Sequence, residues 1–331
     1  MAAAVASGLA VKCPNCAASL DLSPDSVIYV CRYCGWSGLV TNEQVDITGV
    51  LPSDPGQVES AVDAFLRKRT GGEYSVSERK LMMAPFWLIT AHSHTIYNGY
   101  RKETRSRTVG SGKDAHTESY TVYRPVRGVI DEDLPLTLFA RRHERIFALE
   151  KAEEAVRQSS PAKLTQEQLK PLAKSCEFLS SSIGADEANH WAETVVGDTH
   201  RARVEAMCTK VFECYTDVSI PSSRLSFYPL YTVRYESKGR TYRLLYDAAK
   251  ASVLEAEVPL SRGQRVEFLL AGYGLSAVLA GASYELALAI AAVDTVPVAL
   301  WVSGAVAAAA FGLTTFLTLM ATRSQRRLEA K

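Results

Sequence analysis

Hydrophobic and polar positions alternate with a two-residue period in several stretches of the chain, as they do in strands of a half-buried sheet. The first stretch begins with an aromatic and β-branched run at 84–89 and reaches Asn98-Gly99, a common hairpin dipeptide. Alternation continues beyond this dipeptide, which predicts a β-meander at 84–130. A second run with an aromatic-flanked proline opens the stretch 228–258, so we predict a second β-meander there and interpret the pair as a duplicated β unit.

Between these stretches the apolar residues follow a helical period. Val204, Met207 and Val211 recur at steps of three and four, which marks one buried helix face. We therefore predict a helical insert at 138–215. The resulting fold class is α+β, with the two meanders and the insert in one domain at 56–262.

The last sixty residues contain two long apolar runs that are separated at Asp294, and Glu285 is the single charged residue within them. Each run exceeds the ~20 residues that a helix needs to cross a bilayer, so we predict a transmembrane helical hairpin at 267–322. Basic residues flank the hairpin but are absent from its turn, which places both termini, and the basic tail 323–331, on the cytoplasmic side of the plasma membrane. Glu285 lies inside a run, either as a functional intramembrane residue or near the interface.

Composition limits the classes of function. The 331 residues include 37 Lys or Arg and 36 Asp or Glu, and 47% are hydrophobic. This near-neutral balance excludes a protein whose whole surface binds a polyanion, and the apolar fraction excludes a disordered chain. Any contact with nucleic acid must therefore be local. A cytoplasmic location keeps thiols reduced, which favours metal binding over disulfide formation by the seven cysteines.

The strongest local signal is two CxxC pairs with fourteen residues between them, Cys13, Cys16, Cys31 and Cys34. Two such turns, from hairpins with strands at 19–22 and 27–30, supply four thiolates to one tetrahedral metal. We predict a zinc ribbon at 13–48 with one structural Zn²⁺, after a flexible tail at 1–12. Ala17 follows the first cysteine pair at the position that Gly35 occupies after the second pair. An alanine at this position strains the first turn slightly.

The ribbon, the Pro85-Phe86-Trp87 strand, the helical insert and the segment Tyr228–Pro259 together resemble a family of prokaryotic membrane proteins. Members carry a transcription-factor-IIB-type zinc ribbon and are often labelled as resembling the primosomal helicase. The resemblance implies a ribbon joined to a membrane anchor, and it implies no particular activity.

A helicase needs a phosphate-binding loop, and this chain lacks one. The nearest Gly-Lys pair, at 112–113, has Arg107 where the motif needs glycine and Asp114 where it needs Ser or Thr. His92, His94 and His116 could form a second metal site, but no HExxH frame accompanies them. Without a catalytic constellation, we expect that the protein is not an enzyme.

The expected function is a membrane-anchored, cytoplasm-facing scaffold or adaptor whose zinc ribbon binds a protein partner. One alternative is a membrane-associated nucleic-acid-binding protein, and another is an accessory subunit of a transport or ion-conducting complex acting through Glu285. Small residues spaced four apart in the apolar runs leave homo-oligomerisation open. The candidate contacts to nucleic acid or lipid are Lys12, Arg32, Tyr33, Arg101, Lys102, Arg105 and Arg107.

Overall fold

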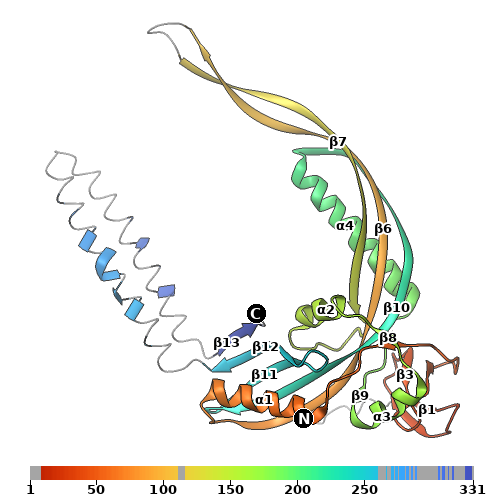
Figure 1. Ribbon diagram of the computed structural model, residues 1–331. Helices are drawn as coiled ribbons and strands as arrows, with labels where there is room; N and C mark the ends of the chain where they lie inside the picture. The colour runs from red at the N-terminus through yellow and green to blue at the C-terminus, as the bar shows by residue number, and fades with distance from the viewer. Residues whose placement is uncertain are drawn as a thin grey trace. The chain divides into compact units, whose positions relative to one another are not determined.

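The computed structural model describes residues 9–110, 116–259 and 325–329, together with scattered residues between 266 and 316 (Figure 1). The chain forms two compact units that interleave along the sequence. The first unit combines the residues up to 54 with 80–232 and 247–251, and the second combines 55–79, 233–246 and the residues from 252 onward. The two longest strands, β6 and β10, contribute to both units.

The first unit begins with two small antiparallel hairpins. Strand β1 (Leu9–Lys12) pairs with β2 (Ser19–Leu22), and β3 (Ile28–Val30) pairs with β4 (Ser37–Leu39). Each cysteine pair follows the first strand of one hairpin, as the CxxC spacing predicts.

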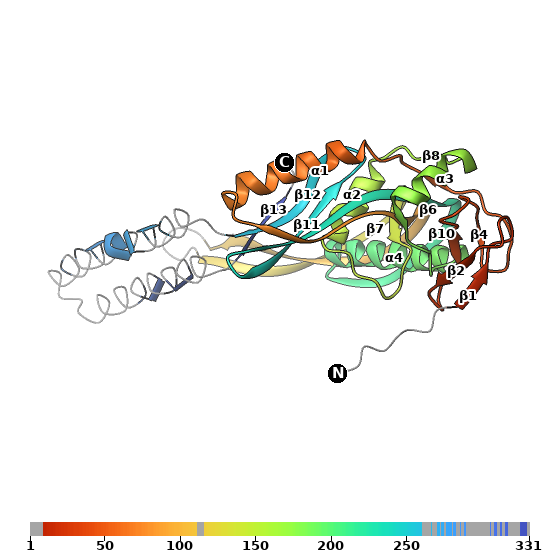
Figure 2. The ribbon, with the colours of Figure 1, turned by 90° about the horizontal axis from the view of Figure 1, so that it is seen from below.

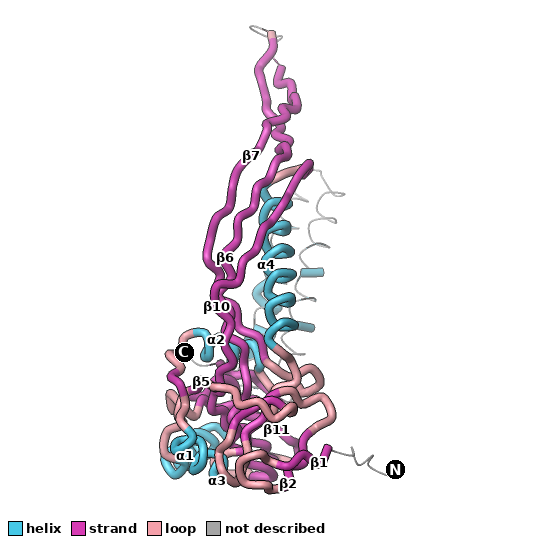
Figure 3. The backbone as a smooth tube through the Cα atoms, turned by 90° about the vertical axis from the view of Figure 1, so that its right-hand side faces the viewer, coloured by secondary structure: helices cyan, strands magenta, loops and turns pink. Residues whose placement is uncertain are grey.

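Three long strands form the main sheet of the first unit. Strand β6 (Ser75–Val109) pairs antiparallel with β7 (His116–Phe139) in one unbroken register, from Phe86 opposite Phe139 to Val109 opposite His116. Strand β10 (Lys210–Ser237) pairs with β6 as well. Figures 1 and 3 show the three strands side by side, with helix α4 (Ala185–Met207) lying along them.

One face of this sheet is covered by α4 and the other is open. Along β6, Ala91, Ser93 and Thr95 are buried whereas His92 and His94 are exposed, which is the two-residue period of a sheet with one covered face. Helix α4 buries every fourth residue, so a single stripe faces the sheet: Ala188, Ala192, Val196, His200 and Val204.

Beyond residue 100, β6 and β7 continue as a two-stranded arm, which we define as 101–109 paired with 117–124. Nearly all of its side chains are exposed or half-buried on both faces. No helix in the described part of the chain covers either face.

The predicted meander at 84–130 is wrong, because Asn98-Gly99 is not a turn. Asn98 lies opposite Arg127 in the middle of the hairpin. A Cβ at Gly99 would lie 2.5 Å from the Lys210 carbonyl oxygen and 3.0 Å from the Cys208 sulfur. Glycine is therefore needed where β10 approaches β6 closely, and the strand continues through it.

The helical part of the insert is shorter than predicted. Helices α2 (Leu149–Arg157), α3 (Gln166–Ser175) and α4 form, but 210–215 belong to β10. Short strands connect this region to the sheet: β5 (Thr48–Gly49), β8 (Ala162–Lys163) and β9 (Glu177–Phe178). Its core includes Trp87, whose indole N–H donates to the Ile183 carbonyl at 2.9 Å.

The second unit is a smaller α+β body. Strands β11 (Arg240–Asp247) and β12 (Ser252–Pro259) continue from β10, and helix α1 (Pro55–Thr70) lies across them, as Figure 2 shows. The helix buries Val58, Val62 and Leu66. The expected second meander at 228–258 is thus not a separate repeat, since its first strand is β10 of the main sheet.

The C-terminal predictions need correction. Among the described residues, no helix is both long enough and apolar enough to cross a membrane. This finding overturns the predicted transmembrane hairpin and the membrane location that depended on it, although most of 267–322 lies outside the described residues. Within the expected basic tail, β13 (Gln325–Glu329) pairs antiparallel with β12.

Candidate metal centre

The two cysteine turns of the ribbon have the same backbone geometry. In the first turn the Ala17 N–H donates to the Cys13 carbonyl at 2.8 Å, and in the second the Gly35 N–H donates to the Cys31 carbonyl at 2.8 Å. The residue after each pair is left-handed, with φ of 59° at Ala17 and 74° at Gly35. Each turn directs both of its sulfurs toward the other turn.

The four sulfurs form one compact cluster. Cys13 Sγ lies 3.7 Å from Cys34 Sγ, and Cys16 Sγ lies 3.8 Å from Cys31 Sγ. All four lie within 4.8 Å of one another, and none forms a disulfide. The cluster could therefore hold a metal ion.

The protein environment gives the metal-free thiols different affinities for protons. Burial raises the pKa of Cys31 to about 12. For Cys34, burial raises the pKa, but hydrogen bonds from the Asn15 side chain and the Trp36 backbone lower it to about 7. At neutral pH all four sulfurs become thiolates together only when a cation replaces the protons.

The two turns differ in how they are covered. Helix α3 packs against the end of the second turn, where a Cβ at Gly35 would lie 2.6 Å from the Lys170 backbone nitrogen. The Gln166 side chain also donates to the Cys34 carbonyl at 3.5 Å. By contrast, the first turn is exposed throughout, over residues 14–17. One end of the ribbon is thus anchored to the rest of the unit while the other faces solvent.

The candidate contact residues fall into two separate groups. On the ribbon, Lys12 is exposed, and Arg32 donates to the Tyr33 hydroxyl at 2.8 Å while its guanidinium lies over the Tyr33 ring. On the arm, Arg105 pairs with Glu103 at 3.6 Å. Figure 1 shows the ribbon and the arm at opposite ends of the long strands.

The other three arm candidates are also exposed. Arg107 pairs with Glu118 at 2.9 Å, whereas Arg101 and Lys102 have no acidic partner among the described residues. Glu285 is an exposed helical residue, and the residues next to it in the sequence lie outside the described part of the chain.

The three histidines weighed as a second metal site do not come together. His92 and His94 share the open face of β6, where they pair with Asp133 and Asp131 at 2.9 Å each. His116 lies opposite Val109 at the far end of the hairpin. Over the described residues, the four cysteines are the only group of this kind close enough to share a metal.

A buried polar network between α4 and the sheet was missed by sequence reasoning. Thr95 Oγ1 lies 2.5 Å from His200 Nδ1, and His200 Nε2 lies 3.0 Å from Glu132 Oε1. The Ser93 hydroxyl lies 3.4 Å from the same Nε2. The sequence feature that could have indicated this network is a histidine within the apolar stripe of a helix, together with a strand that has hydroxyl residues at its inward positions.

This network has the order hydroxyl, imidazole, carboxylate, which is also the order of a nucleophilic triad. However, Thr95 and His200 are completely buried, with 0% exposure each. A substrate therefore has no access to the hydroxyl in this fold. The network instead satisfies buried polar groups and joins α4 to the sheet.

Among the described residues, the four-cysteine cluster is therefore the one candidate site whose reactive atoms lie close together and near solvent. Comparison with protein-family models, curated proteins and solved structures finds no match for this chain.

Proposed function

We propose that this chain is a scaffold or adaptor that binds a protein partner through a ribbon held by one structural Zn²⁺. The observation that carries the proposal is the asymmetry of the four-cysteine ribbon. Its second turn is fixed against α3 at Gly35, and its first turn is exposed. Such an arrangement presents a rigid surface at a fixed position.

The spacing of the sulfurs supports zinc as the ion. Zinc–thiolate bonds of ~2.3 Å in a regular tetrahedron place the sulfurs ~3.8 Å apart. The separations of Cys13 Sγ from Cys34 Sγ and of Cys16 Sγ from Cys31 Sγ, 3.7 and 3.8 Å, fit that value. Disulfide bonding would need sulfurs only ~2.0 Å apart. Four thiolates also complete the coordination sphere, which supports a structural role, since no position remains for water or substrate.

The size of the ribbon core also supports a structural metal. The cluster around the cysteines consists of Cys13, Leu20, Tyr29, Cys31 and Trp36, while Ile28 and Val30 of β3 pack into the core of the first unit. So small a core seldom folds on hydrophobic burial alone, and small domains of this kind usually need a metal or disulfides. When such a site binds zinc, the free energy of metal binding becomes free energy of folding.

Metal analysis of the purified chain tests the first half of the proposal. We expect one zinc per chain in the wild type and none after Cys31→Ser with Cys34→Ser. Cys176→Ser is the matched control, because Cys176 lies outside the cluster and should leave the zinc content unchanged. A zinc-free wild type, or zinc retained by the double variant, would contradict the assignment.

Site-specific photo-crosslinking in the native host tests the second half. A photoreactive amino acid at Ala17, on the exposed turn, should give a discrete heavier species that mass spectrometry identifies as one protein. The same probe at Glu150, which is exposed on α2, should not give it. The product should also disappear when Cys31 and Cys34 are replaced by serine. Equal products at both positions, or none at Ala17, would refute docking through this turn.

A further inference from the structure

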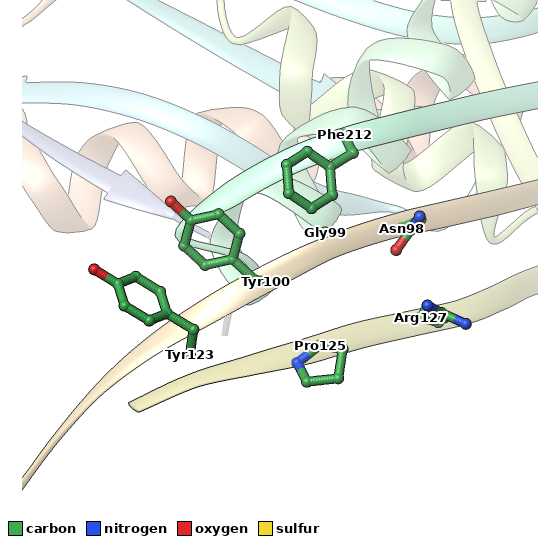
Figure 4. Close-up of a pocket in the computed structure, with 7 residues that line it drawn as sticks. All are labelled: Asn98, Gly99, Tyr100, Tyr123, Pro125, Arg127 and Phe212. Atoms are coloured by element: carbon green, nitrogen blue, oxygen red, sulfur yellow. The ribbon is translucent and has the colours of Figure 1, made fainter. Parts of the chain in front are cut away.

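Three aromatic rings from three strands lie in a row near the base of the arm (Figure 4). The Tyr100 ring is 5.3 Å from the Tyr123 ring and 5.6 Å from the Phe212 ring, centroid to centroid. The two outer rings are largely exposed, Tyr123 by 61% and Phe212 by 58%. With Asn98, Gly99, Pro125 and Arg127, the three rings line an open hollow of about 560 Å³.

Cationic side chains surround these rings. Lys102 lies directly opposite Tyr123 in the β6–β7 register, and Arg127 lines the hollow. Lys210 Nζ lies 5.9 Å from the Phe212 ring centroid. In the described part of the chain, none of these three cations pairs with an acidic group. We call the three rings and three cations the aromatic–basic surface.

The acidic residues of the arm are engaged elsewhere. Glu103 pairs with Arg105 and with Arg124, at 3.6 and 3.2 Å, and Glu118 pairs with Arg107. By the alternation of the two strands, these ion pairs lie on the face opposite Tyr100 and Lys102. These two acidic residues of the arm therefore do not pair with the cations of the aromatic–basic surface.

The arm itself is a structure that gains from a partner. An isolated two-stranded ribbon is marginally stable in water, and this one has both faces open. Exposed aromatic rings at its base add an energetic cost that burial against a ligand would remove.

We infer that the aromatic–basic surface binds single-stranded nucleic acid. Unpaired bases can stack on Tyr123 and Phe212, while Lys102, Arg127 and Lys210 lie close enough to contact the phosphates. The surface offers rings and cations but few groups that read base edges, so binding should depend little on sequence. A purely acidic protein would use the cations and leave the rings exposed. This inference is independent of the ribbon and of its proposed partner.

Fluorescence anisotropy with labelled oligo(dT) and oligo(rU) of about 12 nucleotides, within the range of known single-strand sites, tests the inference on the zinc-loaded full chain. We expect binding at low salt, and log affinity should fall against log salt with a slope of about −2 for three phosphate contacts. A duplex of the same length should bind more weakly, because its bases are already stacked. No binding at low salt, or tighter binding of the duplex, would overturn the inference.

Two sets of variants locate the contact. Tyr123→Ala with Phe212→Ala should weaken binding by about tenfold or more through lost stacking, and both residues are exposed enough to leave the fold intact. Tyr33→Ala, which removes the exposed ring of the ribbon, should leave the affinity unchanged. Equal affinity of the double variant, or loss only with Tyr33→Ala, would overturn the assignment to the arm.

Self-association is the competing use of an exposed aromatic surface. Sedimentation of the wild type and of the double variant should give the same mass at all concentrations. If the wild type is a dimer and the variant with Tyr123→Ala and Phe212→Ala is a monomer, the inference is overturned. The partner of this surface is then a second copy of this chain and not nucleic acid.

Discussion

Replacing Gly35 by alanine should weaken zinc binding strongly, because two separate costs act at this position. Gly35 has a φ of 74°, where an alanine costs about 1 kcal/mol more than glycine. The added Cβ would also lie 2.6 Å from the Lys170 nitrogen and 2.9 Å from its Cα, so the backbone of α3 must move. Overpacking against a fixed neighbour costs about 1–3 kcal/mol.

The sum is about 2–4 kcal/mol, which corresponds to a dissociation constant for zinc that is roughly 30- to 900-fold larger. This conversion follows from the proposal that the ribbon folds as it binds the metal, because strain in the folded ribbon then appears in the metal affinity. Competition with a chromophoric chelator at fixed pH measures the change directly.

Ala17→Gly is the matched substitution in the other turn and should act in the opposite direction. Ala17 has a φ of 59° but is exposed, so glycine relieves the backbone strain without removing a packing contact. The gain is at most about 1 kcal/mol, or up to about fivefold tighter zinc binding. Gly71→Ala supplies a further control, since φ is 71° there and no atom lies within 4 Å of the added carbon.

The reasoning would be refuted if Gly35→Ala bound zinc within threefold of wild type, a factor worth only about 0.7 kcal/mol. It would also be refuted if Ala17→Gly weakened binding, or if Gly71→Ala, which lies in the other unit, changed the zinc affinity at all.

Further outcomes follow from the buried network, the surface histidines and the metal. His200→Ala leaves the buried Thr95 hydroxyl and the Glu132 carboxylate without their shared partner, so the free energy of unfolding should fall by about 2–4 kcal/mol in urea titration. His92→Ala, on the exposed face, should change it far less. The hydrogen bond to Asp133 raises the pKa of His92. The stabilisation from this pair is therefore complete below the unfolded value of about 6.5 and is lost as pH rises through the folded pKa. An NMR titration should show the raised pKa, and Asp133→Asn should return it toward the ordinary value; an unchanged pKa would contradict the pairing. Removing zinc with a chelator should abolish hydrogen-exchange protection in β1–β4 and spare β6 and β7, whereas uniform loss would show that the metal stabilises the whole unit.

The cysteine cluster could be predicted because its information is local. Each CxxC turn fixes two sulfurs within four residues, and only fourteen residues separate the two turns in the sequence. The predicted strands at 19–22 and 27–30 agree with β2 and β3, except that β3 begins at Ile28. The difference between the turns could not be predicted, because it depends on α3, which lies more than a hundred residues further along the chain.

The long strands could not be predicted, because tertiary contacts override the local signals. Asn98-Gly99 is a typical turn dipeptide, but the close approach of Lys210 and Cys208 is what requires the glycine. Val211 falls at helical steps from Val204, yet it lies in β10. Periodicity reports only which side chains are apolar. Here the first residues of a strand continue the three- and four-residue spacing of the helix before it.

The interleaving of the two units has a consequence for how the chain is synthesised. Strand β6 ends at Val109, but its neighbour β10 is complete only at Ser237, so the β6–β7 hairpin leaves the ribosome well before the strand that closes its second edge. At ~5–20 residues per second, the ~100 residues between the end of β7 and the end of β10 take roughly 5–20 seconds. During that interval an open strand edge is available for pairing with other chains. Production of this protein should therefore respond to translation rate and to chaperones that bind unpaired strands, even when the finished fold is stable.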